Sequence, residues 1–240
     1  MGRGRLEIPT RFNGPPGSGH GGYVSGRLAE MIGEPAEITL RAPTPLGTPL
    51  EVAREDGIVS LHDGGRLIAE GRAIEPLELE LPAPVDLAEA ERARSRYRGQ
   101  VSFKTCFVCG RAREDAQRVY AGPVGEGSQA ASPWTPSDDW LADGAGNVRP
   151  EFVWSVLDCP TYFGFYSGAE PGLAMLGRFA VRRLQPVPMG EPHVVTAWRI
   201  GRDGRKLLAG AALSSADGEP RAYARATMIE LDEIPEGARG

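Results

Sequence analysis

The spacing of hydrophobic positions changes from alternation to a helical period at two places in the chain. Past Gly22 the apolar residues fall four apart, on one helix face: Val24, Leu28 and Ile32. Gly33 and Pro35 then end the pattern. A second apolar segment starts at Pro150, a residue favoured in the first turn of a helix. The pattern predicts buried helices at 20–32 and 150–159, the second losing its regularity at Pro160.

Alternating segments follow each predicted helix and predict antiparallel strands. The first set covers residues 36–42, 49–55, 57–62 and 66–74, and a further strand at 5–12 precedes the helix. The second set covers 176–184, 192–200, 205–214 and 221–231, with strands at 118–124 and 128–134 before the helix. Turns containing Asp-Gly separate several of these segments, as in hairpins. The predicted fold class is therefore α+β.

The two helix-plus-strand series form an internal repeat. The pattern Pro-x-Pro-apolar-Gly-x-Pro occurs at 43–49 and again at 186–192. Asp-Gly pairs follow in the same order, at 56–57 and 63–64 and then at 203–204 and 217–218. Such a repeat predicts a pseudo-twofold unit, equivalent to a dimer fused in one chain. We predict an N-terminal unit at 1–80, a solvated charged linker helix within 81–100, and a C-terminal unit at 101–235.

Composition excludes several classes of protein. The 240 residues are 41% hydrophobic, enough for a core, and the net charge of −5 does not favour a nucleic-acid partner. No apolar run reaches the ~18 residues of a membrane span, and residues 1–10 lack the apolar core of a signal peptide. Three cysteines cannot build a disulfide framework. We therefore expect a cytoplasmic protein without a membrane partner.

The glycine-rich stretch before the first helix is the first candidate site. Backbone N–H groups at a helix start are unpaired and can hold an oxyanion, and glycines let a substrate approach the main chain. The candidate residues are Gly19, His20, Gly21, Gly22 and Tyr23. The alternative is that the glycines serve tight packing of the helix on the sheet.

Asp158 on the second helix is the candidate acid. Its apolar neighbours predict a raised pKa, as in a catalytic carboxyl group, although a hydrogen-bonded structural role is the alternative. Thr161 is a candidate to orient a water molecule, and Trp154 to contact a substrate. Arg182 and Arg183 are candidates to bind the phosphates of coenzyme A, or are ordinary solvated strand residues.

Cys106 and Cys109 form a C-x-x-C motif whose role the sequence leaves open. A zinc site usually needs four ligands, and Cys159, His20, His62 and His193 lie too far apart in the sequence to complete one by spacing. We therefore expect no metal and no cofactor. The absence of a βαβ pattern argues against a thioredoxin-like role. A nucleophilic Cys159 would need a base beside it, and none is local in the sequence.

The doubled helix-and-meander layout resembles a double hotdog fold. His20-Gly21-Gly22 resembles the HGG motif of hotdog acyl-CoA thioesterases, and residues 154–160 resemble their acid-bearing helix. The whole layout is similar to thioesterase-like proteins of actinobacterial type. The resemblance implies two antiparallel helices at the interface of the units. One helix start would hold the thioester carbonyl on the Gly22 and Tyr23 amides, and the other helix would supply a carboxylate.

In the family that this chain resembles, the acid follows the motif histidine by about nine or ten residues. That spacing selects Glu30 in the first copy and Asp158 in the second, where Arg149-Pro150-Glu151 replaces the glycine motif. Proline has no N–H, so we predict one complete composite site, in which the His20 motif faces Asp158. Glu30 would be a surface or vestigial acid.

The resemblance implies hydrolysis of an acyl-CoA or acyl-carrier thioester by a water molecule that Asp158 activates, with no metal or redox cofactor. One alternative is a non-catalytic acyl-binding or scaffold protein. Another is a hotdog dehydratase or hydratase, although no Asp-x-Asn-x-x-His-like pattern is present. A homodimer of such double hotdogs is compatible with the layout.

Overall fold

A computed structural model describes residues 3–33, 35–99 and 103–239. The helices are α1 (Gly21–Ile32), α2 (Leu87–Ser95) and α3 (Pro150–Phe165). The strands of the first half are β1 (Arg3–Glu7), β2 (Ala36–Leu40), β3 (Pro49–Glu55), β4 (Ile58–Asp63) and β5 (Arg66–Ala73). Those of the second half are β6 (Gly122–Val124), β7 (Gln129–Trp134), β8 (Ala174–Arg183), β9 (His193–Asp203), β10 (Lys206–Ser215) and β11 (Pro220–Glu230).

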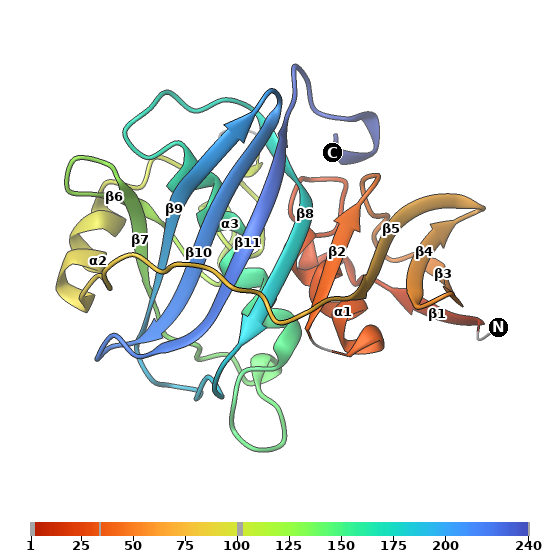
Figure 1. The fold of residues 1–240 in the computed structure, drawn as a ribbon, viewed down its shortest axis with the longest axis horizontal. Coiled ribbons are helices and arrows are strands. Elements are labelled where there is room, and N and C mark those ends of the chain that lie inside the picture. The colour runs from red at the N-terminus through yellow and green to blue at the C-terminus, as the bar shows by residue number, and fades with distance from the viewer. Residues whose placement is uncertain (1–2, 34, 100–102, 240) are drawn as a thin grey trace.

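The described strands form one antiparallel sheet whose two halves have the same order of equivalent strands (Figure 1). From the centre outward, the order β2-β5-β4-β3-β1 matches β8-β11-β10-β9-β7, with β6 added at the edge. The halves join where β2 pairs with β8, from Ala36 opposite Val181 to Thr39 opposite Arg178. The repeated Asp-Gly pairs lie at or beside equivalent turns, β3–β4 with β9–β10 and β4–β5 with β10–β11. The sheet thus follows the predicted repeat, while the unit boundaries at 1–80 and 101–235 stay predictions.

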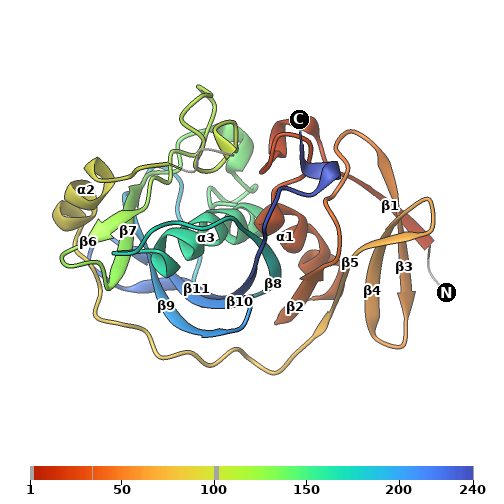
Figure 2. The same ribbon diagram turned by 90° about the horizontal axis from the view of Figure 1, so that it is seen from above.

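Helices α1 and α3 lie side by side in the concave face of the sheet (Figure 2). Two glycines of α1, one turn apart, face the backbone of α3. A Cβ atom at Gly22 would lie 2.7 Å from Asp158 Cβ, and one at Gly26 would lie 2.6 Å from Glu151 Cα. The contacts run in opposite directions along the two helices, so the pair is antiparallel. Larger residues at these positions would force the helices apart.

The predicted end of the second helix at Cys159 is wrong, because α3 continues through Pro160 to Phe165. A proline removes one helical N–H and crowds the preceding turn. The last turns are nevertheless held by burial, since Tyr162 and Phe165 pack with Leu207 and Met228 of the sheet. Tertiary packing here outweighs the local preference of proline.

Two predicted strands are also shorter than expected. Only β1 forms within the expected strand at 5–12, and Thr10–Phe12 is a 3₁₀ turn that stacks Phe12 on Tyr23 with ring centroids 4.3 Å apart. In the expected strand at 118–124 only β6 forms, since the Tyr120 N–H donates to the Ser132 hydroxyl and not to a backbone carbonyl of a neighbouring strand, and Arg118 has a positive φ of 59°. That backbone conformation interrupts a strand.

The segment between the halves does more than connect them. Residues 74–86 cross the outer face of the second half, opposite the helices (Figures 1 and 2). Leu77 is buried there, and its carbonyl accepts hydrogen bonds from Arg182 (3.2 Å) and the Tyr223 hydroxyl (2.7 Å). In α2 the charged side is exposed, but Ala90 and Ala93 are buried beside Ala131 and Val194. The predicted solvated helix is therefore solvated on one side only.

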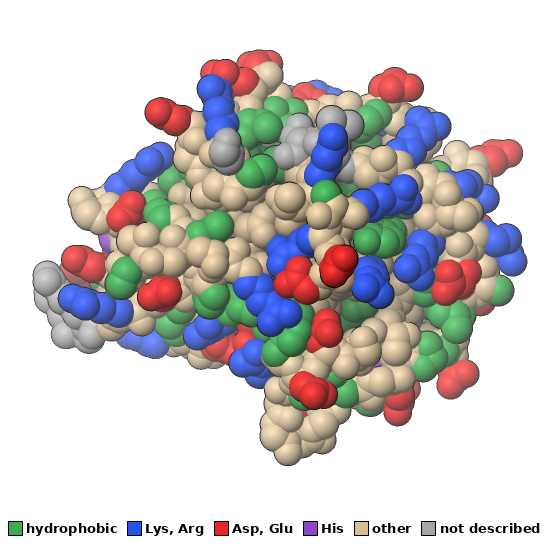
Figure 3. Space-filling view, turned by 180° about the vertical axis from the view of Figure 1, so that it is seen from behind, with side chains coloured by type: hydrophobic (Ala, Val, Ile, Leu, Met, Phe, Trp, Pro, Cys, Tyr) green, Lys and Arg blue, Asp and Glu red, His purple; other side chains and the backbone are tan. Residues whose placement is uncertain are grey.

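The surface carries both signs of charge. On the face drawn in Figure 3, basic and acidic side chains are interspersed over the molecule. None of the helices in the described part of the chain is long and apolar enough to cross a membrane.

The close helix contact predicts the effect of one methyl group. Gly26→Ala should lower the free energy of unfolding by about 1–3 kcal/mol, the usual range for overpacking, although alanine favours an isolated helix. Gly144→Ala is the matched control, because its Cβ would meet no atom within 4 Å. Urea unfolding of the three proteins measures both effects. A Gly26→Ala protein as stable as the parent would contradict the close packing of α1 on α3.

Candidate active site

The crossing of α1 and α3 brings Asp158 to the glycine start of α1. The Gly22 N–H donates a hydrogen bond to Asp158 Oδ2 at 2.7 Å. His20 caps the same helix, with its Nδ1 accepting from the Tyr23 N–H at 3.3 Å and lying 3.5 Å from Asp158 Oδ2. The expected meeting of the first-copy motif with the second-copy acid is thus present as geometry, whereas the roles of these residues stay predictions.

Asp158 keeps one oxygen for a ligand or water molecule. Its side chain is 12% exposed, and burial raises the pKa of the carboxyl group, against the opposing effects of His20 and the Gly22 N–H. The Gly22 N–H and the His20 Nδ1 both lie next to Oδ2 of Asp158. Within residues 3–33, 35–99 and 103–239, no hydrogen bond involves Oδ1. Oδ1 is therefore the atom that can accept a proton.

A pocket of about 280 Å³ opens beside this carboxylate. Its polar end contains Asp158, His20 and the glycine loop. The rest of the wall is mainly apolar and comes from the β2–β8 junction, α3, β11 and the loop at 103–109. Its main apolar residues are Leu40, Phe103, Phe163, Met175, Leu176 and Met228. An apolar chain with a polar end group fits such a site.

The two amides expected to hold a carbonyl already donate hydrogen bonds within the protein. Gly22 binds Asp158 and Tyr23 binds His20, as described above. The Gly21 N–H has no hydrogen-bond partner in the part of the chain that the structure describes, and Gly21 lines the pocket. A Cβ at Gly21 would lie 2.9 Å from Leu176 Cδ2 and 3.2 Å from Asp158 Oδ2. Only glycine leaves this corner of the pocket open.

The side chains of three predicted residues are not among those that line the pocket. The Tyr23 ring is buried against Phe12. Trp154 is fully buried and packs edge-on against Phe179, with ring centroids 5.6 Å apart. The buried Thr161 hydroxyl donates to the Asp158 carbonyl at 2.7 Å, so its proton is not directed to a water molecule. Their side chains belong to the packing of the helices, and spacing alone did not reveal which face they occupy.

The predicted arginines do not line the pocket either. Arg182 binds the Leu77 carbonyl on the outer face of the sheet, and Arg183 is the next residue on β8. The arginine that does line the pocket is Arg41, which pairs with Glu70 at 2.5 Å. Arg41 was not among the predicted residues, because nothing in the local sequence distinguishes it from other arginines.

The position related to this site by the repeat contains two carboxylates, and the helix that begins there has no glycines in its first turn. Pro150 occupies the first turn of α3, and the buried Glu151 lies 3.4 Å from Arg149 Nη1. Glu30 pairs with Arg27 at 3.1 Å. Burial, followed by the charge and hydrogen bond of Glu151, raises the pKa of Glu30. The two copies have therefore diverged in chemistry.

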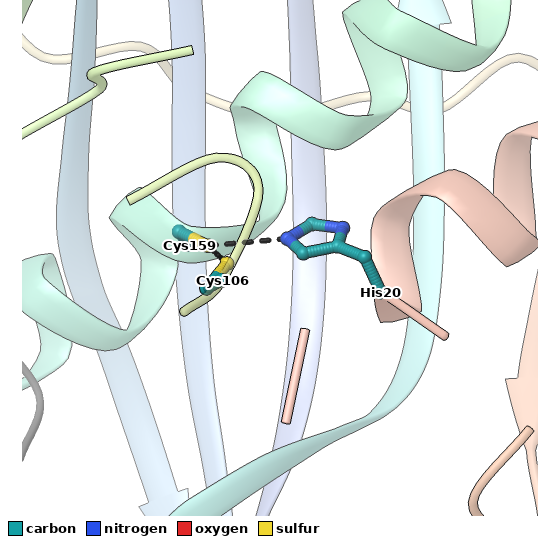
Figure 4. Close-up of side chains that lie close together, drawn as sticks. All are labelled: His20, Cys106 and Cys159. Carbon is teal, nitrogen blue, oxygen red and sulfur yellow. Dashed lines mark hydrogen bonds between the residues drawn. The ribbon is translucent and has the colours of Figure 1, made fainter. Parts of the chain in front are cut away.

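His20 also faces a group of thiols (Figure 4). Its Nε2 lies 3.1 Å from Cys159 Sγ, which lies 3.7 Å from Cys106 Sγ. Sequence spacing did not reveal this group, and the base that is absent from the local sequence around Cys159 is supplied in the fold by His20. Cys159 is 139 positions from His20 and 53 from Cys106, so only the folded chain brings them together. Burial opposes ionisation of Cys106, but hydrogen bonds from Cys109 and Cys159 outweigh it and lower its pKa.

Comparisons with known proteins show the fold. No family model matches the chain, and no curated protein matches it. A candidate thioesterase II from Thermobifida fusca superposes with a TM-score of 0.60 at 13% identity, covering 96% of this chain and 93% of that one. The TesB protein of Mycobacterium avium subspecies paratuberculosis gives 0.58 at 11% identity, covering 95% and 93%. The chain thus has the α+β double hotdog fold, and the predicted resemblance to thioesterase-like double hotdog proteins is confirmed at the level of the fold.

The raised pKa of Glu30 predicts how stability changes with pH. The folded state binds this proton more tightly than the unfolded state, so ionised Glu30 destabilises the fold at neutral pH, and the penalty disappears as pH falls towards the ordinary value of 4.5. Glu30→Gln should therefore melt at a higher temperature than the parent at pH 7.5, and the two should converge near pH 4.5.

Glu91→Gln is the control for this measurement, since Glu91 lies on the exposed side of α2 and pairs with Arg94 at 3.8 Å. It should show no comparable gain at pH 7.5. A Glu30→Gln protein that melts below the parent at pH 7.5 would mean that the ion pair with Arg27 outweighs the repulsion from Glu151.

Proposed function

We propose that this protein hydrolyses an acyl thioester, with Asp158 as the general base. The observation that carries the proposal is the Asp158 carboxylate lying 2.7 Å from the Gly22 N–H at the polar end of an apolar pocket. Thioester hydrolysis needs donors for a developing oxyanion and a base for the attacking water, and both are adjacent here. The thioesterase names of the two structural neighbours support the same class of reaction.

The reaction follows from the positions of these groups. The acyl chain packs against the apolar wall of the pocket, and the thioester carbonyl accepts a hydrogen bond from the Gly21 N–H. It accepts a second hydrogen bond from the Gly22 N–H after the Asp158 carboxylate has turned away from that amide. Asp158 Oδ1 takes a proton from water as the water oxygen attacks the carbonyl carbon. The tetrahedral oxyanion then collapses, the carbon–sulfur bond breaks, and the leaving thiolate receives the proton from Asp158. The products are a carboxylic acid and a thiol.

Arg41 is the cation placed to meet the carrier. It lines the pocket, and its side chain is half-exposed, so its guanidinium can reach a phosphate of coenzyme A or of a carrier-protein prosthetic group. We propose this contact in place of Arg182 and Arg183. Three free thiols further support a reducing compartment such as the cytoplasm. A homodimer of two chains stays a prediction.

The proposal predicts unequal effects of the two repeat-related acids. Asp158→Asn should reduce turnover by about 10²-fold or more, as for removal of a general base. Glu30→Gln should retain most activity, because no glycine helix start faces Glu30. The measurement is release of free thiol from acyl-CoA substrates of increasing chain length, with kcat and KM determined separately.

Three results would contradict the proposal. A fully active Asp158→Asn enzyme would remove the acid from the mechanism, and equal losses in the two variants would mean two working sites. A parent protein that binds acyl-CoA but releases no thiol across the panel would favour the alternative of a non-catalytic acyl-binding protein.

A further inference from the structure

Three side chains with nitrogen or sulfur donors, His20, Cys106 and Cys159, converge beside the proposed active site, and Cys109 lines the same pocket. They come from three separate parts of the chain: His20 caps α1, Cys159 lies on α3, and Cys106 and Cys109 belong to the loop before β6. His20, Cys106 and Cys109 are each less than 5% exposed. Buried, free thiols beside an imidazole form the ligand set that zinc prefers.

The sulfur–sulfur distance matches a tetrahedral metal centre. Zinc–sulfur bonds of about 2.3 Å place two thiolates about 3.8 Å apart, and Cys106 Sγ lies 3.7 Å from Cys159 Sγ. A nitrogen and a sulfur ligand would lie about 3.6 Å apart. His20 Nε2 is 3.1 Å from Cys159 Sγ, so a small outward shift of the imidazole suffices. The three ligand atoms all lie within 4.8 Å of one another.

Cys109 is the candidate fourth ligand, because it lies in the same C-x-x-C turn as Cys106, is 4% exposed and lines the same pocket as Cys106 and Cys159. The group of donor atoms that already lie close together does not include its sulfur, so its side chain would have to turn towards the metal. The C-x-x-C turn is tightly folded, because the Gly110 N–H donates to the Cys106 carbonyl at 2.8 Å and a Cβ at Gly110 would lie 2.5 Å from that oxygen. The loop is also attached to the first half of the molecule, through the Phe107 N–H and the Asn13 carbonyl at 3.0 Å. The ligand loop is therefore held by contacts of its own.

The surroundings of His20 suit a ligand as well. A metal on Nε2 requires a hydrogen on Nδ1, so metal binding would replace the hydrogen bond that Nδ1 accepts from the Tyr23 N–H with one that Nδ1 donates to Asp158 Oδ2, which lies 3.5 Å away. A carboxylate behind a metal-bound imidazole commonly fixes the ring in this way.

We propose that His20, Cys106, Cys109 and Cys159 bind one zinc ion. Four protein ligands make a closed, structural site. It fastens the loop at 103–110 to α1 and α3, and this loop forms one wall of the pocket. The proposal does not depend on thioester hydrolysis, because the site would hold zinc whether or not the pocket is catalytic.

The test measures metal in protein that carries no affinity tag and is purified under reducing conditions. We expect about one zinc per chain by mass spectrometry of the metal. Replacement of zinc by Co²⁺ should give the visible absorption of tetrahedral cobalt with thiolate charge-transfer bands. Cys106→Ser, Cys109→Ser and Cys159→Ser should each weaken binding by at least the ~10–100-fold that follows loss of an outer-shell partner.

His62→Gln is the matched control and should keep the metal, since His62 lies on β4 and contacts Ser60. A chelator should lower the melting temperature of the parent but not of Cys159→Ser. Reduced parent protein that takes up neither zinc nor cobalt would overturn the proposal, whatever the variants do. Full metal content in the three serine variants, or a Cys106–Cys159 disulfide in protein purified without oxidant, would overturn it too.

Discussion

The close approach of α1 and α3 is the interaction on which the rest of this structure depends. Gly22 and Gly26 remove the side chains that would otherwise separate the helices, and the backbone of α3 fills the space. Only at this separation can an Asp158 oxygen reach the Gly22 N–H. The sheet then wraps both helices, and the pairing of β2 with β8 closes the core beneath them.

The repeat shows how one of two equivalent sites can be retained. Pseudo-twofold symmetry places a helix start opposite an acid twice, but Pro150 replaces a glycine amide at the second position. What remains there is the pair Glu30 and Glu151, whose repulsion is only partly offset by Arg27 and Arg149. The first position keeps the glycines and gains a pocket. Divergence of the copies thus concentrates the candidate chemistry on one side of the helix pair.

Local patterns in the sequence predicted the elements better than their surroundings. The spacing of Val24 and Leu28 predicted α1, and the Asp-Gly turns predicted the two meanders, because these signals act within a few residues. Pro160 misled the prediction of α3, since the packing of Phe165 outweighs a local preference. Trp154 and Arg182 were assigned to the wrong surroundings, because periodicity does not say which neighbour a face meets.

The thiol group shows the same limit of sequence analysis most clearly. Cys159 and His20 lie on different halves of the repeat and meet only because the two helices cross. No spacing rule joins them to the C-x-x-C motif, whereas the folded chain places all of these side chains in the lining of one pocket. Arg41 had no local signal either, and its place at the pocket follows from the β2–β8 junction.

The central claim is that the start of α1 and Asp158 act as one site on an acyl thioester. A crystal structure with an acyl-coenzyme A analogue, in which a methylene group replaces the thioester sulfur, tests this most directly. We expect the ketone oxygen within hydrogen-bond distance of the Gly21 and Gly22 amides, with Asp158 Oδ1 reaching the carbonyl carbon through one water molecule. An acyl group bound elsewhere, or a ketone that leaves Asp158 hydrogen-bonded to Gly22, would contradict it.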